Sequence, residues 1–249
     1  MSRKTTQQVS FLMGISFFAL SLIVLFTIFP PAIQESPPWG KTLVGSMFAL
    51  VCILGMTAVF FPTECSRAIG HGRVKSAATR ILETKGGDIG VSYLAGVRLV
   101  HGHHPPCHLF DGHEFHLSGR TFCAGCIGLL IGAIAVLIGT VVYFFTGLPI
   151  DRSAHPLFIA PGILGVLLAL LQFHVINVQH AAARLLINAF FVVATFLILV
   201  GVDLLLHSLT LDLLAVSFSV FWLYTRISLS NWDHERICSS CSVSCEFRP

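Results

Sequence analysis

Residues 185–229 read LLINAFFVVATFLILVGVDLLL-HS-LTLDLLAVSFSVFWLYTRISL, and they indicate how this chain folds. The stretch contains two apolar runs, Leu185 to Leu206 and Leu209 to Leu229. Each run has about the 20 residues that an α-helix needs to cross a bilayer. Because only His207 and Ser208 separate them, the stretch predicts two membrane-spanning helices joined by a tight turn.

Composition and further apolar runs extend this prediction to the whole chain. Of the 249 residues, 55% are hydrophobic and 11% are charged, and the mean hydropathy is +0.83. A soluble domain has about 25% charged residues, so a water-soluble globule is excluded. Four more runs have the length of a membrane span: Phe11–Pro30, Thr42–Pro62, Ala124–Thr146 and Pro156–Ile176. We expect an all-α integral membrane bundle of six helices.

Basic residues indicate which way this bundle crosses the membrane. With a cytoplasmic N-terminus, the outer loops hold only Lys41 and Arg152, and the rest of the 15 Lys and Arg residues fall on inner segments. This bias is the positive-inside pattern of integral membrane proteins. It predicts a protein of the cytoplasmic membrane with both termini in the cytoplasm. The net charge of +3 then reflects topology, and no nucleic-acid partner is predicted.

The spans divide the chain into four parts. Two N-terminal helices (residues 1–62) precede a cytoplasmic loop that is basic and rich in Cys and His (63–123). Four helices (124–229) and a Cys-rich cytoplasmic tail (230–249) follow. Apart from Cys52 in the second span, every cysteine falls on the cytoplasmic side. Because stable disulfides are rare in the reducing cytosol, these thiols are candidates for metal ligation.

Histidine and cysteine gather in the last part of the loop. The sequence reads HGHHPPCH from His101 to His108 and CAGC from Cys123 to Cys126. Thiolate and neutral imidazole are the ligands that zinc prefers, and a Cys-x-x-Cys pair supplies two of them from one turn. A second Cys-x-x-Cys stands in the tail, with one more cysteine behind it. The candidate metal ligands are Cys107, Cys123, Cys126, Cys238, Cys241, Cys245, His103, His104, His108 and His113.

The spacing leaves the pairing of these ligands open. One site would use Cys107, Cys123 and Cys126 with His108 or His113. Another would join the two Cys-x-x-Cys pairs of loop and tail as a split zinc ribbon. A third would hold the three tail cysteines with Cys65 or a histidine. The isolated histidines are interpreted as solvated or locally hydrogen-bonded: His71, His155, His207 and His234.

The run from Cys107-His108 to Cys123-Ala124-Gly125-Cys126-Ile127-Gly128 resembles a known signature. It is a Cys-His element followed by Cys-x-x-Cys-x-Gly at the start of a membrane helix. This signature belongs to uncharacterised multi-pass membrane proteins of bacteria and archaea, grouped as a domain of unknown function. The resemblance covers this segment and implies that Cys107, Cys123 and Cys126 are the positions of interest. No assigned activity comes with it.

The last four spans contain few polar residues. Most of those in the last three spans lie where contact with the aqueous interface accounts for them, near the inner boundary (Gln179, His180, Arg184) or the outer one (Asp203, His207). His174 and Asn188 are predicted to face the bundle interior. In the span from Ala124, the pattern Gly128-x-x-x-Gly132 predicts close packing against another helix.

Three functions fit this sequence. The first is a membrane protein whose cytoplasmic Cys and His residues bind a metal, zinc, in a structural role. The second is a redox or electron-transfer protein with an iron–sulfur centre or a Cys-x-x-Cys dithiol. The third is a metal transporter or sensor. No Ser-His-Asp order, phosphate loop or hydrolase-type carboxylate pair is present, so the sequence does not favour an enzyme. Its expected partners are the lipid bilayer and a second membrane protein or copy of itself.

Overall fold

The computed structural model describes residues 3–31, 36–60, 91–94, 97–100, 108–117, 120–173, 175–176 and 178–240. Within these ranges, six helices are long and apolar enough to cross a membrane. They are α1 (Arg3–Ile28), α2 (Gly40–Phe60), α5 (Ala124–Thr140), α6 (His155–Leu171), α7 (Ala181–Leu206) and α8 (Leu209–Ser240). A π-helical turn, η2 (Val141–Phe145), extends α5, and a short 3-10 helix, η3 (Arg152–Ala154), precedes α6. The prediction of a six-span membrane protein is confirmed.

The turn between the last two spans is as tight as predicted. His207 and Ser208 alone separate α7 from α8, and His207 adopts a left-handed conformation with φ of 46°. Its carbonyl oxygen accepts hydrogen bonds from the backbone N–H and the hydroxyl of Ser36, at 3.0 and 2.8 Å. These bonds attach the connection between α1 and α2 to the turn.

The last helix is longer than predicted. The apolar run ends at Leu229, but α8 continues to Ser240. Trp232, Asp233 and His234 in this extension are buried. Tertiary contacts therefore hold a polar segment in helical form that hydropathy alone assigns to the tail. The backbone of Cys238 belongs to this helix.

Two β-hairpins correct the all-α prediction. β1 (Val91–Leu94) pairs antiparallel with β2 (Val97–Val100), and β3 (Glu114–Leu117) pairs with β4 (Arg120–Cys123). In the second hairpin the rings of Phe115 and Phe122 stack across the strands, with centroids 5.6 Å apart. The sequence analysis searched for apolar runs of membrane length and so missed four-residue strands.

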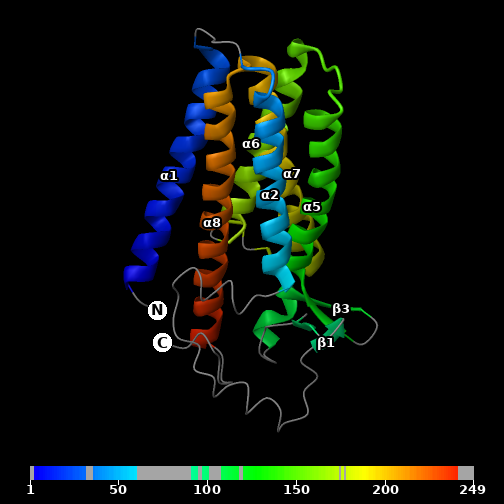
Figure 1. Cartoon of the computed structure of the whole chain (residues 1–249). Coiled ribbons are helices and arrows are strands. Elements are labelled where there is room, and N and C mark those ends of the chain that lie inside the picture. The colour runs from blue at the N-terminus through cyan, green and yellow to red at the C-terminus, as the bar shows by residue number, and fades with distance from the viewer. Residues whose placement is uncertain are drawn as a thin grey trace.

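Both hairpins lie at one end of the bundle, which we call the strand end (Figure 1). The first residues of α1 and the last of α8 are at this same end. The turn between α7 and α8 lies at the opposite end, which we call the turn end (Figure 1). The first and last helices therefore begin and finish on the side of the loop, as the even number of spans predicts.

Helix α7 packs tightly against both α5 and α6. A Cβ on Gly128 of α5 would overlap the Leu185 carbonyl oxygen, and one on Gly132 would lie 2.5 Å from the oxygen of Ala189. On α6, a Cβ on Gly165 would lie 2.5 Å from the Cβ of Ala194. The close contact predicted from Gly128-x-x-x-Gly132 is confirmed, and α7 is its partner.

Substituting Gly132 with Ala should destabilise the bundle, because the new methyl group meets backbone of α7 rather than a flexible side chain. Overpacking of this kind costs about 1–3 kcal/mol. Thermal unfolding in detergent would measure the effect. Gly14→Ala is the matched control, since a Cβ at Gly14 of α1 meets nothing within 4 Å. Equal melting temperatures for the two variants would contradict the packing described for α5 and α7.

Candidate functional site

Charged and polar side chains are buried at the strand end of α7 and α8. Arg184 and Asn188 of α7 and Arg226, Asp233 and His234 of α8 are all buried. The prediction that Arg184 contacts the aqueous interface is therefore wrong, because η1 (His108–His113) and the extended α8 cover this end of α7. Asn188 faces the interior as predicted. His174 lies outside the described residues.

Asn188 links the two arginines. Arg226 Nε donates a hydrogen bond to Asn188 Oδ1 at 2.7 Å. The Asn188 amide nitrogen in turn donates to the backbone oxygen of Arg184 at 2.6 Å. Both guanidinium groups also lie near the ring of Phe173, at 5.7 Å for Arg184 and 5.8 Å for Arg226. The result is a buried bridge between α7 and α8 with two positive charges on it.

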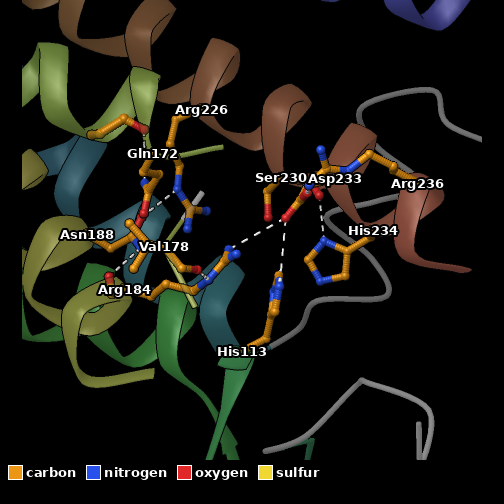
Figure 2. A network of polar contacts seen from close by, with 11 residues as sticks. His113, Gln172, Val178, Arg184, Asn188, Arg226, Ser230, Asp233, His234 and Arg236 are labelled. Atoms are coloured by element: carbon orange, nitrogen blue, oxygen red, sulfur yellow. Dashed lines mark hydrogen bonds and ion pairs between the residues drawn. The ribbon is translucent and has the colours of Figure 1, made fainter. Parts of the chain in front are cut away.

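Asp233 compensates one of these charges. Its Oδ2 lies 3.6 Å from Arg184 Nη1 and 3.8 Å from His113 Nε2 (Figure 2). Its Oδ1 accepts a hydrogen bond of 2.8 Å from Arg236, which is partly exposed. Arg184 is further held by donating its Nε hydrogen to the Val178 carbonyl oxygen at 2.9 Å. This carboxylate thus joins η1, α7 and α8.

Two histidines lie beside this carboxylate. The rings of His113 and His234 meet edge to face with centroids 5.5 Å apart, and both contact the buried ring of Phe110. Nδ1 of His234 is hydrogen-bonded to the Ser230 carbonyl oxygen (Figure 2). The interpretation of His234 as a locally hydrogen-bonded residue is confirmed. The alternative of a solvated side chain is wrong, because the helix continues past Leu229 and buries it.

Gly112 allows η1 to pack closely enough to place His113 beside Asp233. A Cβ on Gly112 would overlap the carbonyl oxygen of Gln179, so η1 lies directly on the backbone that leads into α7. A residue with any side chain at position 112 would push His113 away from Asp233. The six-residue 3-10 helix is therefore positioned by a backbone contact.

The Cys-x-x-Cys pair completes the site. Cys123 is the N-cap residue of α5 and is buried, and Cys126 lies in the first turn. Gly125 between them is so close to α8 that a Cβ on it would lie 2.8 Å from Arg226 Nη2. Arg226 interacts electrostatically with Cys126 and Cys123. The start of α5 and the guanidinium group of Arg226 thus face each other directly.

These side chains enclose a cavity of about 40 Å³. This volume suits a small ion or a few water molecules. The cavity is lined by His113, Cys123, Gly125, Cys126, Phe173, Arg184, Asn188, Arg226, Ser230 and His234. Residues from the loop, α5, α7 and α8 therefore meet around one small, strongly polar space.

The charges around the cavity do not balance. Arg184 has Asp233 beside it. Arg226 is buried, and its hydrogen bond goes to the neutral amide of Asn188. Among the described residues, no carboxylate forms an ion pair with Arg226. A buried guanidinium group is costly without a negative partner, and the cysteines of α5 are the nearby groups that can supply negative charge as thiolates.

The predicted ligands divide into three groups. Cys123, Cys126 and His113 line the cavity together. His108 and Cys238 belong to η1 and α8, but the description of the structure extends only to their backbone. Within the described ranges, no three His, Cys, Asp or Glu side chains are arranged to hold a metal ion. The other candidates lie outside the described residues: Cys107, Cys241, Cys245, His103 and His104.

Comparisons with known proteins find no match. No protein-family model, curated protein or solved structure matches this chain. The chemistry of the site must therefore be inferred from its own residues.

Replacing Asp233 with Asn should strongly destabilise the protein, because Arg184 would remain buried without its carboxylate. Breaking a buried ion pair in this way costs about 3–5 kcal/mol. Arg236→Gln removes the exposed partner of the same carboxylate and should cost at most about 1 kcal/mol. Melting temperatures in detergent compare the two variants. A loss in Arg236→Gln as large as that in Asp233→Asn would contradict the role given to the buried pair.

Proposed function

We propose that this membrane protein binds a zinc ion at the strand-end cavity and that the metal fastens the loop to α5 and α8. The observation that carries the proposal is the lining of the cavity. The Cys123/Cys126 pair and the two oriented histidines, His113 and His234, contribute to the same small space. Zinc in proteins is held by such thiolate and imidazole groups in tetrahedral sites.

Charge supports a ligand set with three cysteines. Zn²⁺ with three thiolates and one neutral histidine carries a net charge of −1, which would compensate the buried Arg226. With only two thiolates the charge of Arg226 would remain unbalanced. Cys107 directly precedes η1 in the sequence and lies outside the described residues. We propose that Cys107 is the fourth ligand, together with Cys123, Cys126 and one histidine. The described lining of the cavity supplies two thiolates, so a third would come from outside the described residues.

The histidines have contacts that suit ligands. A metal-binding histidine usually has its second nitrogen held by a carbonyl or carboxylate group, which fixes the ring and the tautomer. Nδ1 of His234 is held by the Ser230 carbonyl oxygen, and Nε2 of His113 faces Asp233. We propose that His234 Nε2 or His113 Nδ1 is the nitrogen that binds the metal. His113 belongs to the predicted set of ligands, and we propose His234 in addition.

The proposed role is structural and lies on the cytoplasmic side. The bias of basic residues supports placing the strand end, both termini and the metal in the cytoplasm of a cell with this protein in its cytoplasmic membrane. Metal binding would then contribute directly to the stability of a short 3-10 helix and two small hairpins. No reaction is required of such a site.

A dithiol redox site is the second candidate. Its supporting observation is the position of Cys123 at the N-cap of α5, with Arg226 close to both cysteines. A helix N-terminus and a neighbouring cation both stabilise a thiolate and make a cysteine reactive. One thiolate would also balance Arg226. An iron–sulfur cluster is held by four thiolates, or by two thiolates and two histidines in a Rieske centre, so iron and acid-labile sulfide are measured together with zinc.

Metal content per chain tests the proposal. We expect about one zinc per chain in protein purified without oxygen. Cys123→Ser and Cys126→Ser should each abolish binding and lower the melting temperature. Cys52→Ser is the control, because Cys52 is buried in α2 away from the cavity, and this variant should keep its zinc.

The other outcomes separate the alternatives. If the protein contains no metal and the thiols at positions 123 and 126 are alkylated rapidly, the zinc proposal is wrong and the dithiol function is supported. Iron with acid-labile sulfide would identify an electron carrier. Unchanged zinc content in both Cys variants would show that the metal is bound elsewhere.

Arg226→Gln should weaken zinc binding by about 10- to 100-fold, the range found when a group supporting metal ligands is lost. The reason is the loss of the positive charge that balances the thiolates. Competition with a chelator of known affinity measures the change. Arg236→Gln, which leaves the cavity lining intact, should bind zinc like the unmodified protein. An unchanged affinity in Arg226→Gln would contradict the charge argument.

A further inference from the structure

A second buried polar cluster lies at the turn end, where four elements meet. Its members are Lys41 in the first turn of α2, Tyr143 in η2, Asp203 in the last turn of α7 and Asp212 in the first turn of α8. Both aspartates are buried, with 5% and 2% of their surface exposed. The prediction that Asp203 contacts the aqueous interface is therefore wrong, because α2 and η2 cover it. Ionisable groups at such depth indicate function.

Two groups converge on the Asp203 side chain. Tyr143 donates a hydrogen bond to Asp203 Oδ2 at 2.5 Å, and Lys41 Nζ lies 3.4 Å from the same oxygen. The ammonium group also lies 4.1 Å from the centre of the Tyr143 ring. The π-helical turn carries Tyr143, and such turns frequently occur at functional sites. Oδ2 of Asp203 thus has two donors.

Asp212, by contrast, has a carboxyl oxygen without a hydrogen-bond donor. Its carboxyl group interacts with that of Asp203 and with Lys41. Its Oδ1 is buried without a hydrogen-bond partner. Two neighbouring carboxylates repel each other, and the lone ammonium group can neutralise only one of them. With both aspartates ionised, the cluster would hold an uncompensated negative charge away from water.

We propose that Asp203 and Asp212 form a proton-binding site that holds one proton between them at neutral pH. One proton and Lys41 together make the cluster neutral. The proton has a path to water, since the Lys41 side chain is 38% exposed. His207, in the turn between the two helices, is the other titratable group nearby, and its Nδ1 is buried without a hydrogen-bond partner. The site would load and release its proton at the turn end, apart from the cavity with the cysteines.

Infrared spectroscopy of the 249-residue chain in detergent tests this inference. At neutral pH we expect a C=O stretching band from a protonated carboxyl group that shifts in D₂O. The band should disappear in Asp212→Asn and in Asp203→Asn. Absence of the band from the unmodified protein, or its survival in both variants, would overturn the proposal.

Asp151→Asn is the matched control. Asp151 is exposed just before η3 and accepts a hydrogen bond from the Ser153 N–H at 2.8 Å. That bond holds the pKa of the Asp151 carboxyl below its ordinary value, so this group is ionised at neutral pH. The band should therefore be unchanged in Asp151→Asn. Loss of the band in Asp151→Asn would mean that Asp151 carries the proton and would refute the assignment to the pair.

Further measurements use the unmodified protein and one more variant. Raising the pH should remove the band and lowering it again should restore it. If the band does not respond to pH, the carboxyl proton does not exchange with the solvent, and the proposal of a proton-loading site is refuted. Loss of the band on adding sodium ions would instead identify a metal-cation site. The band should be retained in His207→Gln, and its loss there would show that the carboxyl proton depends on His207 and would overturn the assignment to the aspartate pair alone.

Discussion

The contact between the glycines of α5 and the backbone of α7 is the constraint on which the strand-end site depends. Gly128 lies against the carbonyl oxygen of Leu185, one residue after Arg184 and one turn before Asn188. Since α5 begins at Ala124, this approach brings Cys123 and Cys126 to the polar end of α7. A wider spacing of the two helices would separate the thiols from the arginines. Small residues that allow backbones to approach are the usual means of helix association in membranes.

Electrostatics explains why the buried polar groups occur at the two ends of α7 and not between them. From Phe191 to Val202 this helix is apolar except for Thr195 and glycine. Arg184 and Asn188 at one end, and Asp203 at the other, each have partners on α8 or across the bundle. A charge in the middle would have needed a compensating partner in the least polar part of the membrane. Each cluster therefore joins α7 to its neighbours where loops and turns can bring further polar groups.

The spans are predicted well because the thickness of the bilayer sets the length of each apolar run, and that length can be read directly from the sequence. The Gly128-x-x-x-Gly132 contact is predicted for a similar reason, since its spacing is local. His234 and Asp233 are harder to predict, because their burial depends on α8 continuing through a polar segment. A signal does exist: Arg226, Ser230 and Asp233 recur at helical spacing and place one polar face of α8 toward α7. The β-hairpins depend on pairing within a polar loop, which hydropathy does not detect.

The two polar clusters lie far apart on the same helix, α7. Positions 184 and 203 are nineteen residues apart, which at 1.5 Å per residue corresponds to about 28 Å along α7. At that separation the charge of one proton has little direct effect on the strand-end cavity, even in a medium of moderate dielectric constant. A change at Asp203 and Asp212 would reach the cysteines only by moving α7 as a body. Close packing of α7 against α5 and α6 opposes such movement, because backbone already touches glycine at both interfaces. The proposed metal or thiol site at one end and the proposed proton site at the other should therefore respond independently to substitution.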